Sequence, residues 1–122
     1  MIEVACGVMY NSENKILMGK RPSNKFYKGY WEFPGGQLEK NETIEECLKR
    51  EWIEELNLKI EIEREVYSYF YDNKYFCRFF KGKILDEGNL KMNEHEEIQF
   101  LDKKDVYNLK IFEGDSIVLD KL

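Results

Sequence analysis

Three closely spaced glutamates are the residues of this chain whose chemistry stands out. Glu51, Glu54 and Glu55 have the spacing that gathers side chains on one side of a helix with ~3.6 residues per turn. Neighbouring carboxylates repel one another, and more strongly as water is excluded, so a cation should compensate them. Hard divalent cations with oxygen ligands, Mg²⁺ first and Mn²⁺ second, suit such a cluster.

The same glutamates lie on the continuation of an apolar stripe. Ile44, Cys47 and Leu48, one or two turns earlier, fall in the same sector of the predicted helix. A solvated acidic face is the alternative in a chain so rich in glutamate. Arg50 can pair with Glu54 at the i, i+4 spacing, but one guanidinium cannot neutralise three carboxylates. The placement therefore favours a metal site.

The helix that must position these carboxylates has recognisable ends. Thr43, followed three residues later by Glu46, forms a capping box and predicts that the helix begins there. The helix should continue to Leu56, because Asn57 suits a left-handed C-terminal cap. The three glutamates then occupy its last two turns.

Apolar and aromatic runs on both sides of this helix predict a sheet. The expected elements are a hairpin of residues 4–8 and 16–18, a polar loop from 22 that ends in a sharp break at 34–36, a second hairpin of 60–70 and 75–80, a strand at 94–101, a short helix at 102–106 and a terminal helix capped at 115–116. Strands and helices interleave without regular βαβ spacing, which predicts an α+β fold with a mixed sheet flanked by helices.

Length and composition indicate one folded domain over residues 1–122. A chain of 122 residues with 43% hydrophobic and 35% charged residues can bury a single core. Its net charge of -5 has the wrong sign for gripping polymeric DNA or RNA. An acidic protein can still bind a small polyphosphate when divalent cations separate the two sets of negative charge.

Targeting and redox signals point to a cytoplasmic protein with no membrane association. No apolar run approaches the ~20 residues that span a bilayer, and Glu3 lies early in a start without a basic flank. Cys6, Cys47 and Cys77 are odd in number and lack CxxC spacing, with His95 as the single histidine. We therefore expect reduced thiols and no zinc site.

The residues around the glutamates resemble the Nudix box. Over residues 36–58 the matching positions are Gly36, Glu42, Arg50-Glu51-Trp52, Glu54-Glu55 and Asn57-Leu58, and residues 31–35 look like the MutT-type branch. One position departs, because Asn57 stands where the family has glycine; asparagine is the other residue that readily takes positive φ. The resemblance implies a Nudix-type α/β/α sandwich with a mixed central β-sheet.

The resemblance also implies roles for the glutamates. Together with the Gly35 carbonyl they would bind the metals, and Arg50 would orient a glutamate. Either Glu51 or Glu54 would help to deprotonate the attacking water, since the base varies within the family. Glu97 is the candidate for one further metal ligand, while His95 is more typical of a surface or hydrogen-bonded histidine.

Substrate contacts are implied at four further positions. Arg21 would contact phosphate, Phe33 the base, and Gly36 would line the substrate site, although Arg21 and Phe33 could equally serve surface charge and packing. Asp115 lies where similar enzymes hydrogen-bond the nucleobase, but a helix N-cap explains it equally well. The aromatic residues at 67–80 either wall a base pocket or pack in the core.

The activity so implied is Mg²⁺-dependent hydrolysis of nucleoside triphosphates to a nucleoside monophosphate and pyrophosphate. Candidate substrates are oxidised or modified nucleotides of the 8-oxo-dGTP type, or pyrimidine triphosphates. Dinucleotides or nucleotide sugars are the second hypothesis, because the box reads only the diphosphate. A non-catalytic Nudix module that senses a nucleotide is the third, although the intact acidic box argues against it. The partner is a small nucleotide in each case, bound by a monomer or homodimer.

Overall fold

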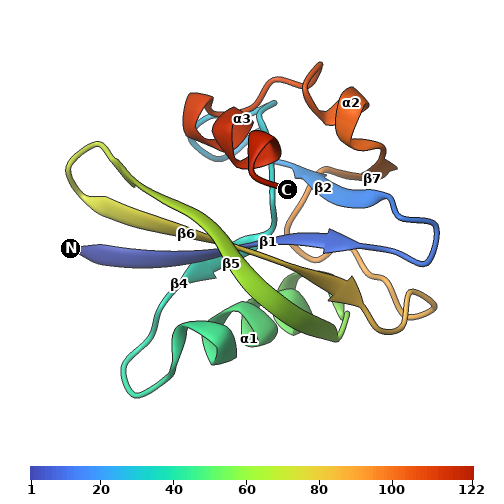
Figure 1. Ribbon diagram of the computed structural model, residues 1–122, viewed down its shortest axis with the longest axis horizontal. Helices are drawn as coiled ribbons and strands as arrows, with labels where there is room; N and C mark the ends of the chain where they lie inside the picture. The colour runs from blue at the N-terminus through green and yellow to red at the C-terminus, as the bar shows by residue number, and fades with distance from the viewer.

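The computed structural model describes residues 1–122 and is built around a mixed sheet of seven strands. The strands are β1 (Ile2–Tyr10), β2 (Ile16–Lys20), β3 (Trp31–Glu32), β4 (Gly35–Gln37), β5 (Ile60–Tyr71), β6 (Tyr75–Ile84) and β7 (Glu97–Leu101); the helices are α1 (Ile44–Leu56), α2 (Lys103–Val106) and α3 (Glu113–Asp120). Helix α1 lies on one side of the sheet, and α2 and α3 lie on the other (Figure 1). This arrangement confirms the expected fold class.

Strand β1 is the centre of the sheet. It runs parallel to β6, from the pair Ile2↔Tyr75 to the pair Tyr10↔Lys83, and antiparallel to β4. Both expected hairpins are present, since β5 and β6 are antiparallel and β1 pairs with β2. The pairing of β1 with β2 is limited to one register position, because β2 pairs along its length with β7.

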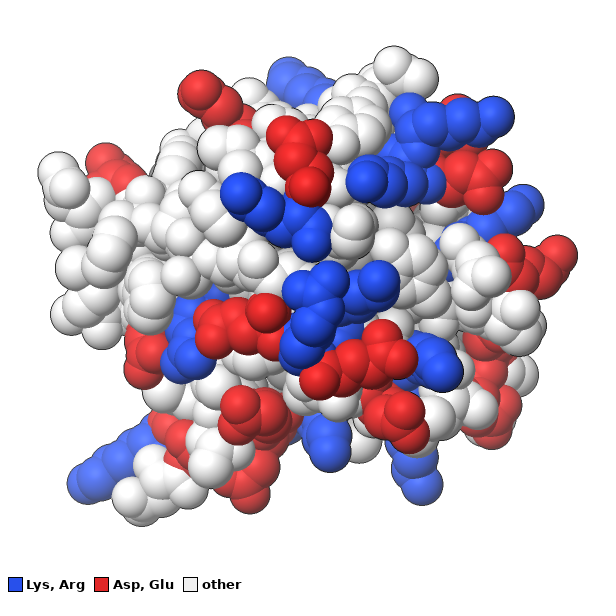
Figure 2. All heavy atoms as spheres, in the orientation of Figure 1, with Lys and Arg blue, Asp and Glu red and all other residues white.

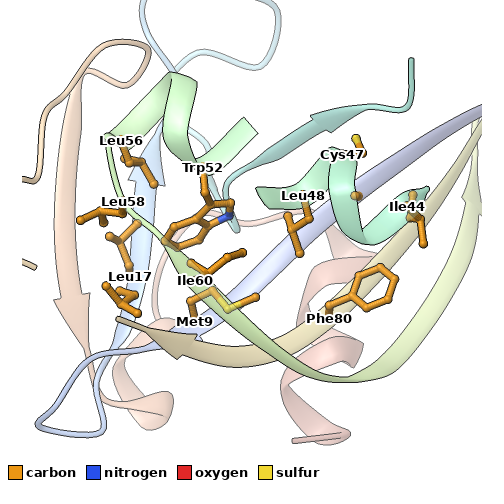
Figure 3. Packing of buried hydrophobic residues seen from close by; sticks show 12 residues of the cluster. Met9, Leu17, Ile44, Cys47, Leu48, Trp52, Leu56, Leu58, Ile60 and Phe80 are labelled. Carbon is orange, nitrogen blue, oxygen red and sulfur yellow. The ribbon is translucent and has the colours of Figure 1, made fainter. Parts of the chain in front are cut away.

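Side chains alternate along β1 between two apolar cores. Ala5 and Met9 belong to the core under α1, whereas Val8 belongs to the core under α2 and α3. Leu48 and Trp52 of α1 are fully buried in the first core, shown in Figure 3, and burial of each stabilises the fold by about 2 kcal/mol. The apolar stripe of α1 thus presses the helix that carries the glutamates onto the sheet.

Both ends of α1 match the prediction. The Thr43 hydroxyl accepts a hydrogen bond from the Glu46 amide at 3.1 Å, and the Glu46 carboxylate accepts one from the Thr43 amide at 2.8 Å. Asn57 takes the left-handed conformation with φ of 55°. The capping box and the asparagine therefore fix where the glutamate-bearing helix starts and stops.

Three predicted boundaries were wrong. Strand β7 begins at Glu97 rather than at residue 94, because His95 turns into the interior before the strand starts. Helix α3 begins at Glu113 with Phe112 as its N-cap, so Asp115 lies inside the first turn and is not a cap. Residues 34–36 do not simply break the chain, because Gly35 starts the short strand β4.

The close approach of β4 to β1 explains this last difference. A Cβ atom on Gly35 would lie 1.8 Å from the carbonyl oxygen of Ala5, so only glycine allows the two strands to pair here. Helix α2 starts after Asp102 as expected, although the Asp102 side chain makes no capping hydrogen bond. No helix of the structure has the length and apolar character that a membrane span needs.

Candidate active site

A cleft of about 1020 Å³ is lined in part by the sheet strands β1, β5 and β6 and has two chemically different ends. The carboxylates of Glu51, Glu54 and Glu55 line one end, whereas Tyr69 and Asp115 line the other. The predicted residues Arg21, Phe33, Gly35 and Gly36 also line it, so the structure brings together all the predicted site residues except Arg50 and Glu97. On the face in Figure 2, acidic and basic side chains interleave, and neither sign dominates.

The Glu51 carboxylate lies against the main chain of Gly36. A Cβ atom at residue 36 would lie 2.3 Å from the carboxyl carbon of Glu51, so any larger residue would displace that carboxylate. The absent side chain of Gly36 is therefore what lets Glu51 lie between α1 and β4. The Glu51 side chain is 16% exposed, compared with 57% for Glu54.

The guanidinium group of Arg50 bonds three glutamates of the carboxylate end, Glu42, Glu51 and Glu54. Its Nη1 donates to Glu51 at 2.8 Å and to Glu54 at 3.2 Å, so the predicted i, i+4 pair is present. Its Nε and Nη2 donate to both oxygens of Glu42, at 3.0 and 2.8 Å. Hydrogen bonds from Arg50 and from the Glu39 amide lower the pKa of Glu42 to about 2. Glu42, which the sequence left without a role, thus anchors Arg50.

Glu55 is the most buried of the three glutamates. Its Oε1 atom is inaccessible to solvent and has no hydrogen-bond partner. Burial raises the pKa of Glu55 to about 9, and the hydrogen bond with Glu51, the charge of Glu51 and the charge of Glu32 add to the rise. A buried carboxylate oxygen without a hydrogen bond is costly, so the Oε1 atom of Glu55 is left open to a further partner.

The buried His95 pairs with the partly exposed Glu32 near Glu55, and the sequence did not indicate this pair. His95 Nε2 lies 2.8 Å from Glu32 Oε2 and 4.0 Å from Glu55 Oε1. Arg21 donates to the other Glu32 oxygen at 2.8 Å. Although burial alone would raise the pKa of Glu32, the hydrogen bonds from His95 and Arg21 outweigh it and lower the pKa. Glu32 therefore stays ionised between two cationic or donor groups.

The predicted ligand Glu97 does not face the cleft. Its carboxylate accepts a hydrogen bond from Gln99 at 2.5 Å within β7, and its side chain does not line the cleft. Glu94, three residues earlier, does line it and pairs with Lys25. The turn at His95 causes the difference, because it separates the cleft-facing residue from the strand. The cleft-facing carboxylate of this segment is therefore Glu94 and not Glu97.

Aromatic rings wall the other end of the cleft. Tyr69 stacks on Phe79 with ring centroids 5.6 Å apart and planes 12° apart, and Phe79 meets Phe33 edge to face at 6.0 Å. Gly114 of α3 packs on the Tyr69 ring, where a Cβ atom would lie 2.2 Å from the ring carbon Cζ. These aromatics thus serve both the core and the cleft wall.

Asp115 is a buried carboxyl group at this apolar end. It is 4% exposed and accepts a hydrogen bond from the Tyr69 hydroxyl at 2.8 Å. Burial raises the pKa of Asp115 to about 7, with the Tyr69 hydrogen bond acting against the rise and the charge of Glu32 adding to it. Cys6 and Cys77 line the same end as free thiols, while Cys47 lies in the other core. This end can hold a flat ring and offer it one polar contact.

The donor set of the carboxylate end fits a hard divalent cation. No three His, Cys, Asp or Glu side chains already stand in a geometry that could hold a metal ion, because Glu51 and Glu54 are turned toward Arg50. The carboxylates of this end offer oxygen ligands, and the buried Oε1 atom of Glu55 has no hydrogen-bond partner. Small rotations of these side chains would present several carboxylate oxygens to one cation.

Comparison with known proteins places the chain in a family. The model of the NUDIX domain matches residues 2–122. The 8-oxo-dGTP diphosphatase of Proteus vulgaris is 41% identical over 59 residues, which cover 48% of this chain and 53% of that protein. The chain thus aligns with about half the length of that relative.

Two further matches extend over nearly the whole chain. The CTP pyrophosphohydrolase of Escherichia coli is 26% identical, covering 98% of this chain and 90% of that protein. The solution structure of the E. coli ORF135 protein superposes with a TM-score of 0.81 at 26% identity, covering 99% of this chain and 87% of the other.

Proposed function

This chain belongs to the NUDIX family of hydrolases, and we propose that it cleaves nucleoside triphosphates to a nucleoside monophosphate and pyrophosphate in the presence of Mg²⁺. The observation that carries this proposal is the single cleft, in which a carboxylate cluster and an aromatic end with a buried carboxyl group lie together. A nucleotide has the same two parts, a polyphosphate and a flat base, joined by a sugar.

The three glutamates of α1 and the Gly35 carbonyl are the groups that would hold the metal. The unpartnered oxygen of Glu55 and the all-oxygen donor set support this assignment. A divalent cation there would neutralise phosphate charge and lower the pKa of a water molecule. Mn²⁺ is expected to substitute, because it accepts the same ligands. We assign the further carboxylate ligand to Glu94 in place of Glu97, because Glu94 lines the cleft.

Three basic residues would orient the carboxylates or bind the phosphates: Arg50, Arg21 and Lys25. Arg50 orients Glu51 and Glu54 through its hydrogen bonds, and either of these carboxylates can take the proton of the attacking water. Arg21 and Lys25 line the cleft with their cationic groups paired to Glu32 and Glu94. A bound polyphosphate would compete with Glu32 and Glu94 for these two cations, so part of its negative charge would lie near Arg21 and Lys25.

Phe33, Tyr69 and Phe79 would enclose the base, and Asp115 would hydrogen-bond its edge. The full-length similarity to a CTP pyrophosphohydrolase supports a pyrimidine triphosphate, whereas the local similarity to an 8-oxo-dGTP diphosphatase supports an oxidised purine triphosphate. Both substrates belong in one screen, because both would use the same metal end.

The test is a turnover screen with purified protein, Mg²⁺ or Mn²⁺, and a panel of ordinary and oxidised nucleoside triphosphates. We expect pyrophosphate and a nucleoside monophosphate from at least one, and a loss of about 100- to 1000-fold in kcat for Glu54→Gln. The proposal fails if no nucleotide releases pyrophosphate and Glu54→Gln behaves like the unmutated protein.

Two other outcomes would indicate a different function. A second organic phosphate among the products would indicate that the substrate is a dinucleotide or nucleotide sugar instead. Ligand-induced stabilisation without turnover would indicate a sensor.

A further inference from the structure

The end of α1 that carries Glu54 and Glu55 is electrostatically unfavourable by itself. The last carbonyl groups of a helix lack partners within the helix and form the negative end of its dipole. No basic residue lies in the last turn of α1, and two carboxylates lie there instead. Donors from elsewhere in the chain are therefore needed to hold this helix end in place.

The segment of residues 89–96 supplies those donors. The Lys91 amide donates to the Leu56 carbonyl at 2.9 Å, and the Asn93 amide donates to the Glu55 carbonyl at 3.0 Å. The Asn93 side-chain amide adds a third hydrogen bond, to the Glu54 carbonyl at 3.1 Å. Asn93 thus binds the main chain of both of the last two glutamates.

The far end of the same segment is fixed to the sheet. The His95 side chain is fully buried, and its Nε2 is bonded to Glu32. A Cβ atom on Gly19 would lie 2.5 Å from the His95 ring, so the ring fits against a residue without a side chain. The Glu96 amide donates to the Lys20 carbonyl at 2.9 Å. Asn93 therefore reaches the helix from a segment that cannot easily shift.

We propose that Asn93 is a positioning residue for the metal site: by bonding the Glu54 and Glu55 carbonyls it fixes the helix end from which their carboxylates reach the cleft. The proposal rests on the proposed function, because it takes those carboxylates as metal ligands. Groups that orient metal ligands typically change metal affinity by about 10- to 100-fold when they are removed. Asn93 holds the ligands through their main chain, so the lower end of that range is expected.

The experiment measures Mn²⁺ binding without nucleotide, by isothermal titration, for the unmutated protein, Asn93→Ala and Asn89→Ala. Asn89 is a matched control in the same segment, because its side chain bonds Asp86 while only its main-chain carbonyl accepts from Asn57. We expect binding about 10-fold weaker in Asn93→Ala and within about 2-fold of the unmutated value in Asn89→Ala. With an active nucleotide, kcat should fall in Asn93→Ala while KM stays within about 2-fold.

A second measurement needs no variant. In the unmutated protein, saturating Mg²⁺ should slow hydrogen exchange at the Lys91 and Asn93 amides, because ligand binding at the helix end stabilises the bonds that hold it. The proposal would be overturned if both variants bound Mn²⁺ with equal affinity. It would also be overturned if the hydrogen-exchange rates of these two amides did not change when Mg²⁺ was added. An unmutated protein that binds no metal would overturn it as well. If the protein binds metal as predicted but turns over no nucleotide, the proposed function is wrong while the role of Asn93 still stands.

Discussion

The two ends of the cleft differ in how the chain builds them. The carboxylates of α1 and the strand before that helix form most of the carboxylate end, and Arg50 ties them together through hydrogen bonds to residues at most 13 positions away. The aromatic end is assembled from Phe33, Tyr69, Phe79 and Asp115, which lie on separate elements. The three helix carboxylates and the arginine that bonds two of them are thus encoded locally, whereas recognition of the base depends on how distant elements pack.

The largest effect is expected at the guanidinium that organises the carboxylate end. Arg50→Lys should lower kcat by about 100-fold, because one ammonium cannot replace a planar fork that bonds several carboxylates at once. Lys49→Ala, on the exposed side of the same helix, is the matched control and should leave kcat unchanged. Steady-state kinetics check both variants, and full activity in Arg50→Lys would contradict this account of the carboxylate end.

The aromatic end should show its character in the pH dependence of stability. The pKa of Asp115 is about 7 in the folded protein, above the value near ~3.9 expected when unfolded. The unfolded chain therefore loses this proton first, so stability falls as pH rises from about 4 to 7. Asp115→Asn should remove this pH-dependent loss of stability, which is on the order of 4 kcal/mol. Urea denaturation at several pH values measures it, and parallel curves for the two proteins would refute the assignment.

The same residue should govern choice of substrate more than rate. Asp115→Ala removes the buried carboxyl group of the aromatic end, so discrimination between bases in kcat/KM should change by about 10-fold. The kcat for the preferred nucleotide should stay within about 3-fold, because the carboxylate end is untouched. Tyr69→Phe keeps the stacked ring and removes only the donor to Asp115, so it should have a smaller effect of the same kind.

The smallest effect is expected at the departure from the family pattern. Asn57→Gly would relieve a positive φ of 55° but would lose the side-chain hydrogen bond to the Asn89 carbonyl. These contributions, each about 1 kcal/mol, oppose one another, so the free energy of unfolding should change by less than about 1 kcal/mol. Thermal denaturation checks this, and unchanged kcat would confirm that the glycine is dispensable for the metal end.

The contrast between the two ends also explains what could be predicted from the sequence. Capping at Thr43 and Asn57 is local, so the limits of α1 and the common location of its glutamates followed from spacing alone. The pairing of Arg50 with Glu42 did not follow from spacing, since Glu42 lies before the helix and reaches Arg50 only after the loop folds back.

Longer-range packing decided the remaining positions. Glu94 rather than Glu97 faces the cleft because His95 turns inward to meet Glu32, a contact between residues 63 positions apart. Asp115 is buried because α3 starts at Glu113 and packs Gly114 against Tyr69, which no local capping rule anticipates. Helix periodicity and capping rules describe neighbours in the chain, so they could not place these residues.

The most direct test of the division of labour is one pair of kinetic measurements on the nucleotide that the unmutated protein prefers, with saturating Mg²⁺. For Glu54→Gln we predict a fall in kcat of about 100- to 1000-fold with KM changed by less than about 3-fold. For Asp115→Ala we predict the reverse pattern, a raised KM with kcat nearly unchanged. Wild-type kcat in Glu54→Gln, or the same pattern in both variants, would contradict the assignment of bond cleavage and base recognition to opposite ends of the cleft.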